Sequence, residues 1–160
     1  EPIDFETSAY ETLKELSKQN IVYIEAFFSP WDYGNSLIKP GSIANAYLDG
    51  IARAESEFNI QCRLIADITR DHGHETALKR LDEITPFLGE KIIGIGLGGS
   101  EHIFPTHLFK DVFIEARRRG FHCVAHAGEV AGPESIWSAI NDLNVERIGH
   151  GVRAIEDAKI

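Results

Sequence analysis

A histidine and a glutamate three residues apart are the residues best suited to chemistry in this sequence. They occur in the run His122-Cys-Val-Ala-His126-Ala-Gly-Glu129, where an apolar stretch gives way to glycine. An imidazole is a good zinc ligand, and a nearby carboxylate that is not itself a ligand can move the proton of an attacking water. Gly128 lets the chain turn sharply between the two side chains. The pattern indicates metal-assisted hydrolysis.

A second histidine, His150, ends the next apolar stretch in Arg147-Ile-Gly-His150-Gly-Val. A lone histidine in such a place is more often a buried structural residue than a functional one. Two histidines at successive strand ends, with Glu129 between them, favour a shared site because neighbouring strand ends face one cleft. The other histidines are interpreted as surface or supporting residues: His72, His74, His102, His107 and His122.

The glycine-rich run Gly94-Ile-Gly96-Leu-Gly98-Gly99-Ser100 contains the spacing GxGxxG, which can bind a dinucleotide when it follows a strand and opens a helix. Here Pro105 delays the next helix, and no acidic residue ends a strand about 20 positions later. We therefore favour another interpretation. Glycines at the end of a strand let backbone amides meet the edge of a planar ligand.

These residues lie on a regular alternation of helices and short apolar strands. Apolar residues at helical spacing predict helices over 7–19, 43–58, 78–88, 108–116 and 133–143, with another beginning at Ala154. Short β-branched or aromatic runs predict five strands, at 21–28, 62–68, 92–97, 122–127 and 147–150. This alternation is typical of a parallel α/β sheet. Two folds remain open: a flavodoxin-like open sheet, and a closed (β/α) barrel of eight units, which typically takes about 250 residues.

In both folds, functional residues gather at the carboxyl ends of the strands. Polar or glycine residues lie at or near the carboxyl end of every predicted strand, and they are Glu25, Asp67 with Arg70, Gly96–Glu101, His126–Glu129 and His150. The sequence therefore predicts one site at that edge of the sheet.

Composition limits the partners of the chain. With 25 acidic and 16 basic residues the net charge is −9, which repels nucleic acid and anionic membranes. The longest apolar runs fall far short of the roughly 20 residues of a membrane helix. A small, uncharged or cationic molecule is the expected partner. Cys62 and Cys123 lie in apolar runs without CxxC spacing, which predicts a reduced, cytoplasmic protein, and the start Glu-Pro-Ile-Asp is expected to be internal.

The segment Phe121–Asp157, with its HAGE and GHG motifs, resembles the adenosine deaminase family of the amidohydrolase superfamily, at the spacing of that family. Val22-Tyr-Ile-Glu25 followed by Ser29-Pro30 is similar to the second strand of the family. Gly96–Glu101 is similar to its glycine-rich turn before a glutamate. The resemblance covers most of the chain and implies the (β/α) barrel.

The resemblance also implies roles. His126 matches a zinc ligand, Glu129 the general acid/base beside the purine ring, His150 the histidine that orients the attacking hydroxide, and Gly99 a backbone contact to the base. The remaining ligands of the family are an HxH pair on the first strand and an aspartate on the last, and neither is in this sequence. Residues 1–160 are therefore expected to be the central part of a single metal-dependent hydrolase barrel. About five β/α units are present, the first and last strands are missing, and the piece alone is expected to be inactive.

The predicted function is that of a zinc-dependent hydrolytic deaminase of a 6-aminopurine nucleoside, converting adenosine to inosine and ammonia. Adenine and aminodeoxyfutalosine are alternative substrates, because the family often carries acids at Gly96 and Ser100 and an arginine at Phe27. Two predictions from another class are a nucleoside-binding barrel relative without turnover and a flavodoxin-like binding module. The oligomeric state is not predicted.

Overall fold

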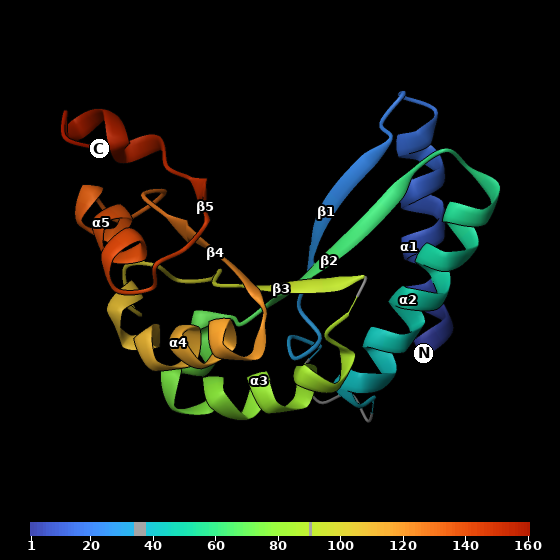
Figure 1. The fold of residues 1–160 in the computed structure, drawn as a ribbon, viewed down its shortest axis with the longest axis horizontal. Helices are drawn as coiled ribbons and strands as arrows, with labels where there is room; N and C mark the ends of the chain where they lie inside the picture. Colours follow the sequence, from blue (N-terminus) through green and yellow to red (C-terminus); the bar gives the residue numbers. More distant parts are fainter. Residues whose placement is uncertain (34–37, 90) are drawn as a thin grey trace.

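The structure is a computed structural model that describes residues 1–33, 38–89 and 91–160. One five-stranded sheet forms its centre, with parallel neighbours that follow each other in chain order. The strands are β1 (Tyr23–Phe28), β2 (Gln61–Asp67), β3 (Ile92–Gly96), β4 (His122–Ala127) and β5 (Arg147–His150). A flavodoxin-like sheet has the strand order 2-1-3-4-5, so the sequential order excludes that fold. Figure 1 shows the sheet curling into an open half-barrel, which confirms the predicted barrel segment.

The α-helices of the described residues lie outside the curl of the sheet (Figure 1). They are α1 (Pro2–Ser17), α2 (Pro40–Glu57), α3 (Ala77–Ile84), α4 (Lys110–Arg119) and α5 (Pro133–Asn141). Three of them start with a proline, whose fixed φ suits the first helical turn. Gly120 ends α4 in the left-handed conformation, with φ of 97°. The predicted alternation of helix and strand is therefore confirmed.

The prediction that a helix begins at Ala154 is wrong. The chain instead forms a short 3-10 helix, Val152–Glu156, and Asp157 then adopts an extended conformation. The carboxylate of Asp157 accepts hydrogen bonds from Trp137 Nε1 at 2.8 Å and from the Lys159 amide at 3.0 Å. This tie to α5 favours a turn over a further helical turn.

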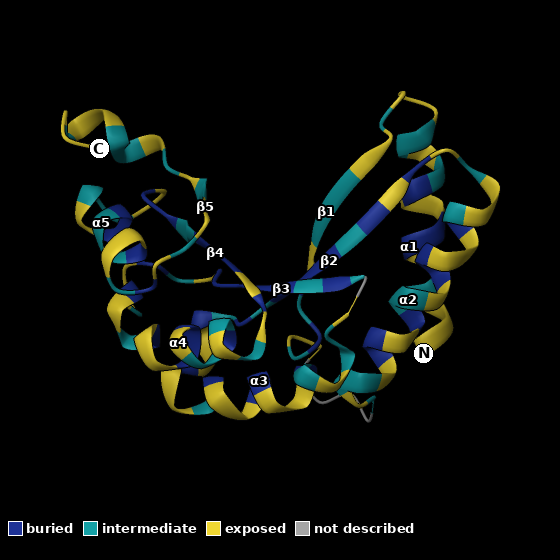
Figure 2. Ribbon diagram, in the orientation of Figure 1, coloured by how far each residue is buried: buried dark blue, intermediate teal, exposed yellow. Residues whose placement is uncertain are grey.

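The core lies between the sheet and the helices. Figure 2 shows buried residues along the strands and on the helix faces turned toward them, while the outer helix faces are exposed. In β2, Cys62, Leu64 and Ala66 belong to this core. Because side chains alternate along a strand, Ile65, which lies between them, and Asp67, which follows Ala66, face the concave side. The concave side is therefore the place for inward-pointing site residues.

The concave side also holds a polar contact between the two edge strands. Arg147 on β5 lies with Nη2 2.5 Å from Glu25 Oε2 on β1, and the hydrogen bonds from Arg147 and Tyr23 lower the pKa of Glu25. Glu25, Ile65, Arg147 and their neighbours line a cavity of about 390 Å³. The two edges of the half-barrel thus approach each other near the amino ends of the strands.

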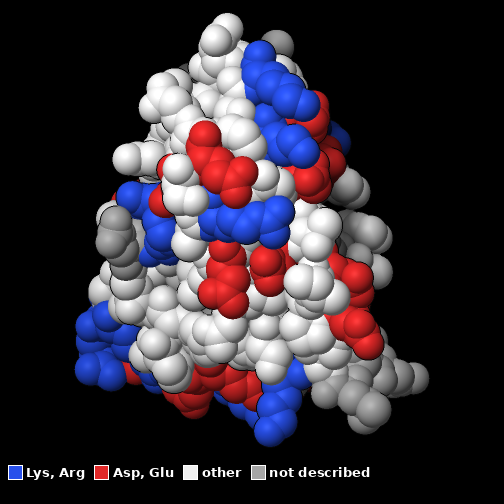
Figure 3. Space-filling view, turned by 90° about the vertical axis from the view of Figure 1, so that its right-hand side faces the viewer, with Lys and Arg blue, Asp and Glu red and all other residues white. Residues whose placement is uncertain are grey.

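The outer surface over α1 and α2 carries charges of both signs. Figure 3 shows basic and acidic side chains interleaved on that face. Among the pairs, Arg53 on α2 reaches Glu6 on α1 at 3.5 Å and Glu57 at 3.8 Å. Within the described ranges, no helix is long and apolar enough to cross a membrane.

Candidate active site

His126 lies at the carboxyl end of β4 on the concave side of the sheet. Its half-buried ring is flanked edge-on by the Phe27 ring, with centroids 5.1 Å apart, and by the His150 ring, with centroids 4.8 Å apart. Burial lowers the pKa of His126, and the neighbouring His150 adds to this effect. The lowered pKa favours the neutral imidazole, which is the form that can ligate a metal.

Gly149 makes room for the His126 ring. The two residues are paired across β4 and β5. A Cβ on Gly149 would lie 2.6 Å from His126 Cδ2, closer than such contacts occur. The glycine is thus required by the neighbouring imidazole, in addition to any role in the GHG motif.

His150 departs from the strand conformation. Regular alternation after Gly149 would turn its side chain away from the concave side. Instead its φ is 65°, a left-handed value that is uncommon outside glycine. The ring consequently meets His126, and Nε2 lies 3.4 Å from Glu129 Oε2. Backbone strain of this kind is concentrated at functional sites.

Glu129 stands on the turn after β4. Gly128 makes this turn with φ of 67°, and a Cβ there would lie 2.5 Å from Ile136 Cδ1 on α5. The Glu129 side chain is 53% exposed, and its carboxylate faces His150. The structure therefore brings His126, Glu129 and His150 together from two neighbouring strand ends, as the sequence predicts.

Gly99 lies on the loop after β3, on the β2 side of this edge. Its φ is 91°, and the nearest atoms to a Cβ there belong to Asp71, Arg70 and Thr69. The Asp71 carboxylate accepts the Ser100 amide at 2.8 Å and also the Ser100 hydroxyl, which lowers the pKa of Asp71. Gly99 is thus held against the loop after β2.

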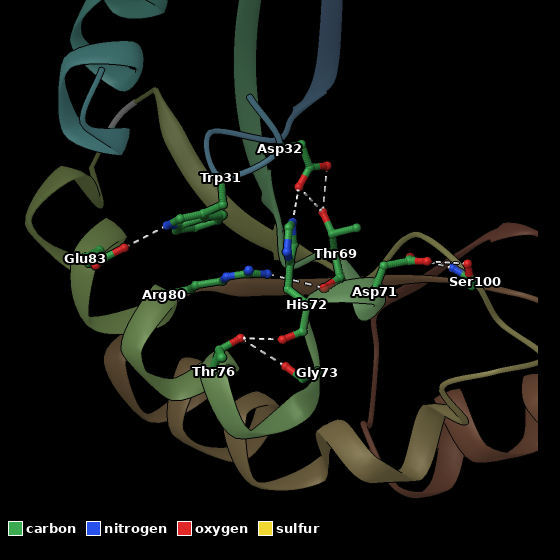
Figure 4. A network of polar contacts seen from close by, with 10 residues as sticks. All are labelled: Trp31, Asp32, Thr69, Asp71, His72, Gly73, Thr76, Arg80, Glu83 and Ser100. Atoms are coloured by element: carbon green, nitrogen blue, oxygen red, sulfur yellow. Dashed lines mark hydrogen bonds and ion pairs between the residues drawn. The ribbon is translucent and has the colours of Figure 1, made fainter. Parts of the chain in front are cut away.

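Figure 4 shows how polar contacts join the loops after β1 and β2. Asp32 accepts hydrogen bonds from Thr69 Oγ1, at 2.9 Å to each oxygen, and its Oδ1 lies 2.7 Å from His72 Nε2. Arg80 donates to the Thr69 carbonyl at 3.3 Å. His72, interpreted from the sequence as a surface or supporting residue, is therefore one of the links between these loops.

Asp67 ends β2 on the concave side. Burial raises the pKa of its carboxyl to about 6, although the Gly98 amide and the Ser29 side chain favour the charged form. Among the described residues, Oδ1 is buried and has no hydrogen-bond partner. This oxygen lies 3.4 Å from the place of a Cβ on Gly96. Asp67 is therefore an ionisable residue at the carboxyl end of β2, and the sequence analysis assigned it no role.

Two buried charged residues stand behind the site, and the sequence placed them at strand ends without a role. They are Arg70, which is fully buried, and Glu101, which is 6% exposed. Arg70 Nη2 donates to the His126 carbonyl at 2.7 Å, and Glu101 accepts backbone amides from the Glu129 turn. The available signal was a charged residue directly after a predicted strand or a glycine run.

The donor set fits only part of a zinc site. The neutral imidazole of His126, which its lowered pKa favours, suits one ligand position. Within the described part of the chain, no group of three or more His, Cys, Asp or Glu residues could hold a metal ion. A zinc ion here would therefore need ligands from outside these residues.

The parallel β/α half-barrel is that of the amidohydrolase type of barrel, on which it superposes. The family model of adenosine deaminase matches residues 1–160. An adenosine deaminase of Yersinia pseudotuberculosis is 41% identical over 153 residues, covering 95% of this chain and 46% of the relative. An adenine deaminase of Ectopseudomonas mendocina is 40% identical over 157 residues, covering 98% and 50%. The chain belongs to the adenosine deaminase family.

Solved structures support the same fold. An adenine deaminase from Arthrobacter aurescens superposes with a TM-score of 0.92 at 28% identity, covering 99% of this chain and 48% of that one. An amidohydrolase from Burkholderia ambifaria, with bound Zn, gives 0.90 at 27% identity, covering 99% and 44%. The chain thus spans about half the length of the relatives that it matches.

Proposed function

We propose that residues 1–160 are the central part of a single (β/α)8 barrel whose first and last strands lie outside this chain. The complete barrel is a zinc-dependent hydrolytic deaminase that converts adenosine and water to inosine and ammonia. One observation carries the proposal: His126, Glu129 and His150 meet at neighbouring strand ends in a chain that belongs to the adenosine deaminase family.

His126 supplies one ligand of the zinc ion, and the others come from the strands outside this chain. A zinc ion bound there lowers the pKa of a water and so favours nucleophilic attack at neutral pH. The position of His126 suits this role because Phe27 and His150 fix its ring from two sides.

Glu129 delivers a proton to the ring nitrogen beside the carbon that carries the amino group. The attack at C6 then places no full negative charge on the ring. The carboxyl group is exposed toward the substrate space and gives this proton in its protonated form. Of the two protons of the attacking water, one leaves with the amino group as ammonia and the other restores the acid form of Glu129. His150 holds the attacking water toward C6, and its left-handed backbone directs the ring to that side. Gly99 offers its backbone amide to the base.

Adenine is the second candidate substrate. The relative that is 40% identical and the solved structure with a TM-score of 0.92 are both named adenine deaminases. The chain differs from the family pattern at Phe27, Gly96 and Ser100, which surround the same edge of the sheet. These positions are where a free base and a nucleoside would be distinguished.

The test uses the complete barrel protein and three purine substrates in parallel: adenosine, adenine and aminodeoxyfutalosine. Glu129→Gln keeps the size of the side chain but cannot deliver a proton at neutral pH. We expect kcat to fall by about 10²–10⁴-fold with the zinc content unchanged. His126→Ala should lose zinc instead. Deamination is followed by ultraviolet absorbance, and metal content by elemental analysis.

Glu134→Gln is the matched control. Glu134 lies in the first turn of α5, five residues from Glu129, and its Oε1 accepts the Gly132 amide at 2.9 Å. Its activity should remain within about threefold of wild type, as for an ordinary surface substitution. A Glu129→Gln protein within tenfold of wild type, or a zinc-loaded wild type that leaves all three substrates unchanged, contradicts the proposed function.

A further inference from the structure

Buried polar side chains are few in the described residues, and four of the five lie in one connected network behind the His126–Glu129 segment. Arg70 Nη1 donates to Thr106 Oγ1 at 3.2 Å, and Thr106 Oγ1 lies 3.2 Å from Ser135 Oγ. Ser135 Oγ donates to Glu101 Oε1. The network therefore links a buried cation and a buried carboxylate through two hydroxyls.

At one end of this network, Glu101 holds the turn that carries Glu129. Its Oε1 accepts the Gly128 amide at 2.6 Å, and its Oε2 accepts the amides of Glu129, Val130 and Ala131 at 3.2, 2.9 and 3.0 Å. These bonds and the Ser135 hydroxyl lower the pKa of Glu101 although burial opposes the charge. Four successive amides directed at one carboxylate fix the path of the backbone over the whole turn.

At the other end, Arg70 holds the strand just before this turn. Its Nη2 donates to the His126 carbonyl at 2.7 Å, and its Nη1 donates to the Phe104 carbonyl at 3.0 Å. The network thus binds the backbone on both sides of Gly128. The His126 carbonyl is held before the glycine, and the amides of residues 128–131 are held at the glycine and after it. Two of the residues to which the proposed function gives a role, His126 and Glu129, are positioned in this way.

The Glu129 side chain has little support of its own. It is 53% exposed, and its Oε2 lies 3.4 Å from His150 Nε2. The direction of its carboxylate is consequently set by the backbone turn. Because Glu101 holds the turn, a substitution at Glu101 should displace Glu129 more than the rest of the fold.

We propose that Glu101 is a positioning residue for Glu129, acting through the four amides of residues 128–131. The proposal rests on the proposed function, since it assigns to Glu101 the geometry of the proton-transfer step. A purely structural role would make Glu101 contribute to folding alone. The two roles differ in their effect on kcat when Glu129 is already absent.

The experiment is a double-mutant cycle in the complete barrel protein, with Glu101→Gln, Glu129→Gln and the double variant, assayed with adenosine. Glu101→Gln keeps the shape of the side chain but replaces one carboxylate oxygen with an NH2 group. That group is a donor and cannot accept the backbone amides, so the hydrogen bonds to that oxygen are lost. We expect kcat to fall about 100-fold, because a misplacement of about 1 Å costs that much, with KM and zinc content unchanged. The double variant should be no more than about threefold slower than Glu129→Gln alone, since both changes remove one function.

Three results would overturn the proposal: Glu101→Gln activity within threefold of wild type, a fall in kcat matched by loss of zinc, or effects that multiply in the double variant. If Glu129→Gln alone is harmless, the proposed function fails and not merely the role of Glu101. Ser135→Ala removes one bond to Glu101 and provides the test if Glu101→Gln does not fold. We expect about a tenfold loss of kcat from it, at the low end of the cost of losing a supporting residue. Ser138→Ala, whose hydroxyl donates to Asp142 on the same helix, should be silent, and a silent Ser135→Ala would also overturn the proposal.

Discussion

Gly149→Ala adds one methyl group at the point where β5 faces the His126 ring. The new Cβ would lie 2.6 Å from His126 Cδ2, 3.3 Å from Nε2 and 3.4 Å from Cγ. All three atoms belong to one imidazole, so the ring has to move as a unit. The backbone of Gly149 cannot retreat easily, because Gly149 is paired with His126 in the β4–β5 register.

The size of the movement follows from these distances. Ordinary contact begins at 3.4 Å, so the ring has to shift by about 0.8 Å. Zinc–nitrogen distances tolerate only about 0.2 Å. The rings of Phe27 and His150 limit the directions in which the imidazole can yield. We therefore expect zinc affinity to fall about 10–100-fold, as when a supporting residue of a metal site is lost, while stability changes by about 1–3 kcal/mol.

The assay measures zinc affinity by competition with a chelator in the complete barrel protein, together with deaminase activity at saturating zinc. Gly89→Ala is the matched control, because a Cβ at Gly89 has no neighbour within 4 Å. It should bind zinc like wild type. Zinc affinity within threefold of wild type in Gly149→Ala would refute the reasoning, since it would show that the His126 ring is not held where a ligand must be.

Two predictions concern stability. Burial raises the pKa of Asp67 to about 6, so below pH 6 the native carboxyl takes up a proton that the unfolded chain binds only near pH 4. Asp67→Asn should therefore stabilise the protein by up to about 3 kcal/mol at pH 7, and the gain should vanish near pH 4 in denaturant titrations; an equal gain at both pH values contradicts the shift. Gly128→Ala combines a φ of 67° with a Cβ 2.5 Å from Ile136 Cδ1, so we expect a loss of about 1–3 kcal/mol. Ile136→Ala removes both Cδ1 and the Cγ1 at 2.6 Å, so the loss caused by Gly128→Ala should be smaller in an Ile136→Ala background, and an equal loss in both backgrounds would assign it to the backbone alone.

The fold could be predicted largely from local patterns. Apolar spacing indicated the five strands within a few residues of their bounds, and Pro133 and Gly120 marked a helix start and a helix end. Length alone favoured an open sheet over a barrel. The family resemblance and the sequential strand order indicate the barrel. The short length is consistent with it, because a segment of a barrel need not reach the length of a whole one.

The cluster of His126, Glu129 and His150 could be expected because neighbouring strands in a parallel sheet end at one edge. Its geometry could not. The sequence gives no sign that His150 adopts a φ of 65°, and regular alternation would have turned its ring away from His126. The requirement for glycine at position 149 could not be predicted either, because it depends on the His126 ring, which is 23 residues away in sequence.

The support of the site was missed for a more general reason. Glu101 acts on residues 128–131 and Arg70 on residue 126, so each contact joins segments that are far apart in the chain. A charged residue after a glycine run is ordinarily solvated, and only burial gives it a different meaning. Once buried, a carboxylate needs donors, and four backbone amides satisfy it without any matching side-chain signal in the sequence. The residues that hold the backbone of a site therefore escape pattern analysis more readily than the residues that carry out its chemistry.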